Sequence, residues 1–81
     1  MKKTVFVRYF AILREQRGLS EEEISTTAAT AREIYEELRG IHGLTLPSSR
    51  VRLAVNDEFG PWESEVRAGD ALAFLPPVSG G

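Results

Sequence analysis

The sequence predicts an α+β domain of two layers, in which one main helix packs across a mixed sheet of four or five strands. The chain has 81 residues, which is enough for one domain but not for a second one beside it. Several segments with the composition of strands flank a single longer segment that has helical spacing. The last of them, Ala71 to Leu75, is apolar throughout, as expected of a strand in the middle of a sheet.

The first part of the chain predicts two strands joined through a short helix. Residues 3–10 (KTVFVRYF) alternate between two faces and are rich in β-branched and aromatic residues, so they predict a strand. Residues 11–16 favour a helical turn that ends at Gly18. Residues 21–27 predict a weaker strand, with Ile24 as its only large apolar residue. We expect the two strands to pair as an antiparallel hairpin.

A capping pattern marks the start of the main helix. Thr30 and Glu33 form the Thr-x-x-Glu capping box, in which each residue satisfies a free backbone donor of the first turn. Three apolar residues recur at helical spacing and predict the buried face: Ile34, Leu38 and Ile41. We expect the helix to end near Gly40 or Gly43.

The second part of the chain predicts a loop, a strand and a turn. Residues 45–49 contain a proline and polar residues and read as a loop, whereas residues 51–55 (VRLAV) read as a strand. Asn56-Asp57 is a turn pair that tolerates left-handed backbone. The short returning segment Glu58-Phe59 is expected to be broken by Gly60-Pro61.

The last strand is expected to connect the sheet to a projecting tail. Ala68-Gly69-Asp70 is a turn, and residues 71–75 form the final strand. If this strand lies beside the first one, the two run parallel and are joined by a right-handed crossover through the helix. We therefore expect a folded domain over residues 1–75 and an extended tail over residues 76–81.

Composition and charge argue against several classes of function. A formal net charge of −2 argues against nucleic acid as the main partner, because phosphate binding needs a clustered basic surface. The chain has no cysteine, which excludes disulfides, thiol nucleophiles and cysteine-based metal sites. No apolar run of signal-peptide or membrane-span length follows Lys2 and Lys3. We expect a cytoplasmic protein that binds no membrane, no metal and no cofactor of its own.

The segment LPPVSGG, from Leu75 to Gly81, predicts a rigid stem with a bare tip. Two prolines favour an extended path, and two glycines follow that have no side chain. With Gly81 as the chain end, its carboxylate is ionised at neutral pH and reacts as an electrophile only after a partner activates it. Adenylation by ATP would do so, in a narrow tunnel that admits only backbone. A sulfur or amine nucleophile could then capture the acyl group.

Other residues that could carry chemistry are better explained by structure. His42 is the only histidine, and a metal site needs several convergent ligands. Two acidic pairs and one acidic run are expected to be solvated charges: Asp57-Glu58, Glu63/Glu65 and the run from Glu21 to Glu23. Trp62 is expected to close one end of the core, the alternative being that it anchors an interface.

Three residues outside the tail are predicted to contact the partner that encloses it. Leu75 lies where the last strand meets the tail, so the partner has to pass over it. Phe59 is expected to belong to an exposed apolar patch near Leu75, and Arg14 to add a charged contact at the rim. The tail is expected to contribute three further residues: Pro76, Pro77 and Val78.

Taken together, these features resemble the small, sulfur-carrier subunits of molybdopterin synthase, which are ubiquitin-like β-grasp proteins. The resemblance covers essentially the whole chain, and it rests on four segments: YFAILRE at 9–15, LAVN at 53–56, AGD at 68–70 and FLPPVSGG at 74–81. The double glycine is shared by all ubiquitin-like carriers, whereas the PPVSGG ending is far more specific to the molybdopterin branch. The segment FGPW at 59–62 departs from the family, which more often continues without the Gly-Pro break.

The resemblance implies a mechanism and a set of partners. An adenylating enzyme similar to ubiquitin-activating enzymes would form an acyl-adenylate at Gly81, and a persulfide donor would convert it to a thiocarboxylate. The large synthase subunit would take up the tail, Gly80 included, and pass the sulfur to cyclic pyranopterin monophosphate to build the molybdopterin dithiolene. The chain would be a co-substrate in a heterotetramer rather than an enzyme alone. By position, Phe59, Leu75 and Arg14 match interface residues of the family.

Three other functions agree with a Gly-Gly ending. The chain could carry sulfur for thiamine thiazole, for thiolation of a tRNA base or for amino-acid synthesis. It could also be a ubiquitin-like modifier that is joined through Gly81 to lysines of target proteins. In a plain β-grasp binding module the tail would be an inert, frayed end, and removing Gly81 would change nothing.

Overall fold

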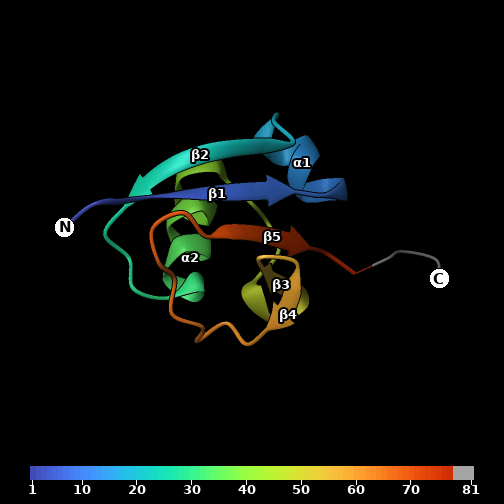
Figure 1. The fold of residues 1–81 in the computed structure, drawn as a ribbon. Coiled ribbons are helices and arrows are strands. Elements are labelled where there is room, and N and C mark those ends of the chain that lie inside the picture. The colour runs from blue at the N-terminus through green and yellow to red at the C-terminus, as the bar shows by residue number, and fades with distance from the viewer. Residues whose placement is uncertain (78–81) are drawn as a thin grey trace.

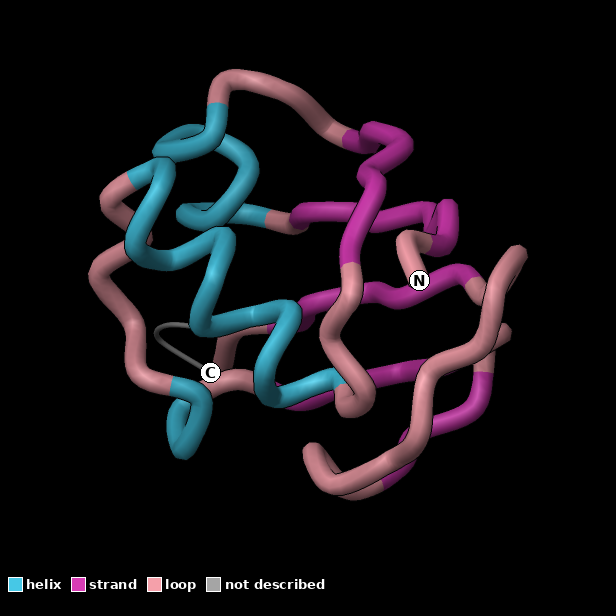
Figure 2. Tube along the Cα trace, turned by 90° about the vertical axis from the view of Figure 1, so that its left-hand side faces the viewer, coloured by secondary structure: helices cyan, strands magenta, loops and turns pink. Residues whose placement is uncertain are grey.

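A mixed sheet and helices packed on one of its faces make up the fold. The computed structural model describes residues 1–77, and the segment 78–81 lies outside the described residues. The strands are β1 (Lys3–Tyr9), β2 (Glu21–Thr26), β3 (Arg52–Val55), β4 (Glu58–Gly60) and β5 (Ala71–Leu75). The helices are α1 (Ala11–Arg17), α2 (Ala31–His42) and the short 3₁₀ helix η1 (Ser48–Arg50). Figures 1 and 2 show α2 lying across the sheet, which confirms the predicted α+β fold.

The strands pair in the order β2-β1-β5-β3-β4, so β5 lies at the centre of the sheet. β1 runs antiparallel to β2 and parallel to β5, with Val7 opposite Leu72. β3 is antiparallel to both of its neighbours, β5 and β4. The predicted hairpin, the central position of the last strand and its parallel pairing with the first strand are all confirmed. None of the helices within residues 1–77 is long and apolar enough to cross a membrane.

The core between α2 and the sheet is built around an aromatic cluster. The Phe74 ring centroid lies 4.9 Å from that of Tyr35, 5.8 Å from that of Trp62 and 6.0 Å from that of Tyr9. Phe74 and Tyr35 are fully buried, and Trp62 packs against the core while remaining partly exposed. Trp62 therefore closes one end of the core, as the sequence predicted.

The main helix begins as predicted but buries a different residue at its end. Thr30 caps α2 by accepting a hydrogen bond from the Glu33 backbone N–H, and Gly43 ends the helix in the left-handed conformation. Ile41, expected in the core, is 70% exposed. The chain reverses at Gly43, so Leu44 folds back and is buried instead, as is common at helix ends of this kind.

The turn between β3 and β4 uses the left-handed backbone that its residues predicted. Asn56 and Asp57 have φ of 51° and 70°. The Asn56 side chain accepts a hydrogen bond from the Ala71 backbone N–H and donates one to Asp70, at 2.9 and 3.1 Å. Gly60, expected to break the returning segment, is instead the last residue of β4 and pairs with Leu53. Part of the predicted loop before β3 forms η1.

Substitution of Ala11 by glycine is expected to stabilise the domain. Ala11, the first residue of α1, has φ of 51°, a left-handed value that costs an alanine about 1–2 kcal/mol. Glycine adopts it freely but has more conformational entropy in the unfolded chain. We expect a net gain of about 0.5–1 kcal/mol, measured by chemical denaturation. The matched variant Ala29→Gly, at an exposed alanine that is not among the residues with positive φ, should lower stability. Equal losses in both variants would contradict strain at Ala11.

Candidate functional site

The candidate site begins where β5 ends. Leu75, its last residue, pairs with Arg52 of β3, and Leu75 and Pro76 are partly buried whereas Pro77 is exposed. Figure 1 shows this end of β5 on the opposite side of the molecule from the N-terminus. The predicted reactive residues Gly80 and Gly81, together with Val78, lie outside the described residues, so their roles stay predictions.

The face of the sheet opposite α2, which we call the outer face, carries an apolar strip. Along β5, Leu72 and Phe74 are fully buried in the core, so the alternate residues of that strand lie on the outer face. Strand register places Ala54 opposite both Ala73 and Phe59, in one row across three strands. The apolar residues of the outer face are Phe6, Ala54, Phe59, Ala71, Ala73 and Leu75. The phenylalanines Phe6 and Phe59 are 45% and 60% exposed.

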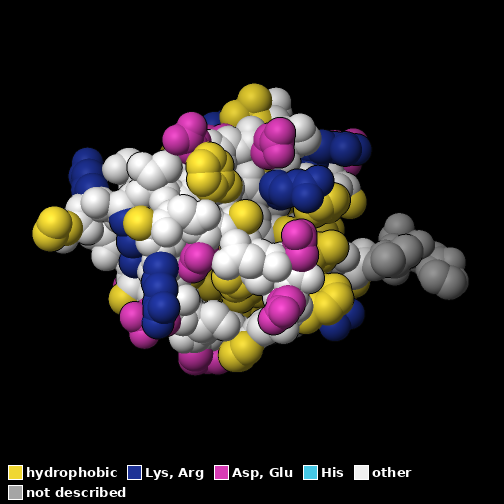
Figure 3. Space-filling view, viewed as in Figure 1, with side chains coloured by type: hydrophobic (Ala, Val, Ile, Leu, Met, Phe, Trp, Pro, Cys, Tyr) yellow, Lys and Arg dark blue, Asp and Glu magenta, His cyan; other side chains and the backbone are white. Residues whose placement is uncertain are grey.

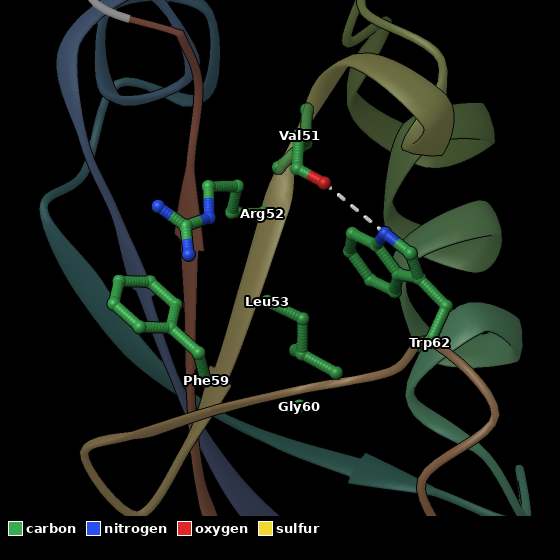
Figure 4. Close-up of a pocket in the computed structure, with 6 residues that line it drawn as sticks. All are labelled: Val51, Arg52, Leu53, Phe59, Gly60 and Trp62. Atoms are coloured by element: carbon green, nitrogen blue, oxygen red, sulfur yellow. Dashed lines mark hydrogen bonds between the residues drawn. The ribbon is translucent and has the colours of Figure 1, made fainter.

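Arg52 lies between two of the predicted contact residues. It pairs with Leu75 across β3 and β5, and its guanidinium lies 3.9 Å from the centroid of the Phe59 ring. Figure 4 shows the Arg52 and Phe59 side chains together on one side of β3. Phe59 and Leu75 thus share the outer face, and Arg52 neighbours both of them. Sequence reasoning missed Arg52, although an arginine that alternates with buried Leu53 was a usable signal.

Arg14 lies on the other side of β5, beside the end of β1. It lines a small hollow of about 180 Å³ together with Arg8, Phe10 and Glu21. The Arg8 guanidinium lies 5.3 Å from the Phe10 ring centroid and 4.0 Å from a carboxylate oxygen of Glu21. The predicted contact residues Arg14 and Phe59 therefore flank β5 from opposite sides. Sequence reasoning missed Arg8 and Phe10.

The position of Arg14 depends on how α1 is held against the sheet. Glu22 accepts two hydrogen bonds from the Arg17 guanidinium, both 2.8 Å, and one from the Tyr9 hydroxyl at 2.6 Å. The bond from Arg17 holds the pKa of Glu22 below its usual value, and burial followed by the bond to Glu22 raises the pKa of Tyr9. The prediction that the whole run from Glu21 to Glu23 is solvated is therefore wrong for Glu22, because its neighbours supply a cation and a hydroxyl.

The Glu22 carboxylate should make the domain less stable in acid. Its pKa is lowered on folding, so its contribution is complete above the unfolded pKa, near 4.5, and is lost as the pH falls through the lower folded value. We expect Glu22→Gln to cost about 1–3 kcal/mol at pH 7. The difference in Tm between the two proteins should shrink as the pH falls below about 4.5. A difference that stays constant down to pH 2, roughly two units below the usual pKa, would contradict an ionised role for Glu22.

Guanidinium groups flank the apolar strip where β5 ends. Arg8 and Arg14 lie on the β1 side and Arg52 on the β3 side. Figure 3 shows hydrophobic side chains gathered over this end of the sheet, with Lys or Arg side chains above and below them and Asp or Glu side chains beside them. An apolar centre flanked by arginines suits a protein surface that has an apolar centre and carboxylates facing those arginines. The arrangement can position a partner around the segment that follows Pro77.

Comparison with known proteins places this arrangement in context. The molybdopterin synthase sulfur carrier subunit of Haemophilus influenzae is 37% identical over 78 residues, which cover 93% of this chain and 96% of that relative. SAMP1, a small archaeal modifier protein from Haloferax volcanii, aligns with a TM-score of 0.80 at 26% identity, covering 96% of this chain and 99% of that one.

A third comparison concerns a complex. In the complex of subunits 1 and 2 of the molybdopterin-converting factor from Helicobacter pylori, one chain aligns with a TM-score of 0.64 at 28% identity, covering 96% of this chain and 99% of that one. The sheet order and these likenesses confirm the predicted ubiquitin-like β-grasp fold. The sequence pattern of the ThiS family matches residues 7–81. The chain therefore belongs to the ThiS family.

Proposed function

We propose that the chain is the sulfur-carrier subunit of a molybdopterin synthase. The observation that carries this proposal is the segment from Pro76 to Gly81, which follows the central strand directly. The chain is also 37% identical to such a subunit, over 96% of that subunit's length. β5 is hydrogen-bonded on both sides, so the segment that follows it starts from a fixed point. The folded domain of residues 1–75 positions the tail, and residues 76–81 carry the reactive carboxylate.

The chemistry takes place at the Gly81 carboxylate. An oxygen of this carboxylate attacks the α-phosphorus of ATP on the adenylating enzyme, and pyrophosphate leaves. The terminal sulfur of a persulfide then displaces AMP, and a thiol cleaves the resulting acyl disulfide to leave the thiocarboxylate. Gly80 and Gly81 have no side chain, so a narrow tunnel around them can enclose the backbone closely. The large subunit uses the thiocarboxylate sulfur to build the dithiolene on cyclic pyranopterin monophosphate.

The outer face near Leu75 is the docking surface for the large subunit. Phe59 and Leu75 supply apolar contact, and Arg14 is one of the arginines that flank it. Tail residues Pro76, Pro77 and Val78 lead from this surface to the reactive end. An arrangement of this kind lets the domain bind first and then direct the terminus into the active-site pocket of the large subunit.

Intact mass spectrometry of the chain tests the proposal. The chain is incubated with ATP, its adenylating enzyme and a sulfur donor, and then with the large subunit and cyclic pyranopterin monophosphate. The expected result is the mass increase for exchange of one oxygen by sulfur, lost again as molybdopterin forms. An increase that persists with this precursor would assign the chain to another sulfur pathway. Isopeptide adducts on lysines in cell extracts would instead favour a protein modifier.

Replacement of Leu75 by alanine should weaken docking without harming the fold. Leu75 is partly buried at the end of the central strand, in the middle of the proposed docking surface, and truncation of a central interface residue costs about 1–2 kcal/mol of binding. Titration calorimetry with the large subunit should show roughly a tenfold weaker Kd. Ile41→Ala is the matched control, because Ile41 is 70% exposed on α2, in the other layer. If both variants bind alike, the docking surface is not at Leu75.

A further inference from the structure

A pocket opens at the edge of the sheet where β4 stops pairing with β3. β4 follows β3 only as far as Gly60, because Pro61 has no N–H to donate and the chain turns away. Trp62 then points back toward β3 and donates its indole N–H to the Val51 carbonyl at 3.1 Å. The indole thus supplies a hydrogen bond to the Val51 carbonyl beyond the end of β4, and a gap remains between the indole and Phe59.

The gap is a pocket of about 370 Å³ with largely apolar walls. Its lining residues are Val51, Arg52, Leu53, Phe59, Gly60 and Trp62. Figure 4 shows Phe59 and Arg52 on one side of β3, and Leu53 and Trp62 on the other. The indole N–H is already bonded, so the guanidinium of Arg52 is the polar side-chain group left at the mouth. Such a pocket suits an apolar group that has a negative charge beside it.

Charge and position together indicate which molecule fills the pocket. Within residues 1–77, none of the ion pairs involves Arg52, whose guanidinium instead stacks on Phe59. Phe59 belongs both to this pocket and to the outer face, and Arg52 pairs with Leu75. A protein that covers Phe59 and Leu75 therefore lies over the mouth of the pocket as well.

We infer that this pocket receives one apolar side chain of the large synthase subunit, next to a carboxylate of that subunit that pairs with Arg52. The inference rests on the proposed function and adds a specific anchor to it. The pocket depends on Pro61 and Trp62, within the segment FGPW. Carrier domains without that segment have no reason to offer the same pocket, so the anchor would favour the matching large subunit over others.

Trp62 is the only tryptophan of the chain, so a spectroscopic signal from tryptophan reports on this pocket alone. The full chain is labelled with 5-fluorotryptophan, which gives a single ¹⁹F resonance, and is titrated with unlabelled large subunit. We expect the resonance to shift and its solvent isotope effect to fall, because the incoming side chain excludes water from the indole. Calorimetry on the same samples gives the affinity independently of the label.

Charge reversal tests the rim of the pocket. Arg52→Glu should weaken binding roughly tenfold or more, because it replaces attraction to a carboxylate by repulsion. Arg67→Glu is the matched control, since Arg67 is also exposed and lies in the loop before β5. Tm values of both variants should stay close to that of the parent chain, since both side chains are exposed.

The outcomes separate the pocket from the carrier function. A complex that forms normally while the ¹⁹F resonance and its isotope effect stay unchanged would overturn the pocket and leave the carrier function standing. Equal affinities of the Arg52 and Arg67 variants would overturn the role of Arg52. If calorimetry detects no complex with the large subunit, both the pocket and the proposed function fail.

Discussion

Deletion of Gly81 is expected to abolish sulfur loading and to leave the folded domain intact. The deletion moves the reactive carboxylate back by one residue, about 3.3 Å along an extended chain, so it no longer reaches the adenylating centre. Residues 1–77 already contain the core and all the strand pairings described above. Mass spectrometry should detect no thiocarboxylate, whereas thermal unfolding should give a Tm within about a degree of the parent chain.

Ser79→Ala is the matched control for this deletion, because it alters the same segment and keeps the last two residues. It should load sulfur at a rate close to that of the parent chain. Normal loading of the deletion variant would show that Gly81 is not the modified residue. A large drop in its Tm would show instead that the segment 78–81 contributes to the domain, contrary to the predicted division at Leu75.

Replacement of Phe74 by alanine should cost about 3–5 kcal/mol of folding free energy, the usual cost of emptying a buried phenylalanine site. Phe74 is fully buried on the central strand and contacts the rings of Tyr9, Tyr35 and Trp62. A small domain has only about 5–15 kcal/mol in total, so the variant should be close to unfolding at 37 °C. Urea denaturation followed by Trp62 fluorescence measures the loss directly.

The same substitution on the outer face provides the comparison. Phe6→Ala removes a ring that is 45% exposed, so it should cost about 1 kcal/mol or less. Phe74→Leu, which keeps part of the volume, should fall between the two. If Phe6→Ala and Phe74→Ala destabilise the domain equally, the aromatic cluster is not the centre of the core.

The strands and helices could be predicted because each one shows its pattern locally. Alternation marks β1, a capping box marks the start of α2, and an apolar run marks β5 as central. The end of α2 is harder to predict, since spacing places Ile41 and Leu38 on one face, whereas the reversal at Gly43 leaves Ile41 exposed and buries Leu44. Helical spacing does not report where the chain reverses.

The surroundings of the site residues depend on strand register, which a single sequence does not give. Phe59 and Leu75 could be selected from their positions in the chain, but Arg52 neighbours both of them only because β3 pairs with both β4 and β5. A run of three glutamates predicts solvated side chains, and the sequence does not show that the turn after α1 brings Arg17 back to Glu22 or that strand pairing brings Tyr9 to it.

The pairing of β1 with β5 also affects how the protein is made. Phe6 pairs with Ala71, so the centre of the sheet joins segments from opposite ends of the chain. Such distant pairing makes folding slow, and a growing chain cannot complete the sheet until β5 has been synthesised. A product that stops before β5 should therefore be unfolded and open to proteolysis. The cell would seldom hold a folded domain that lacks the strand from which its reactive segment emerges.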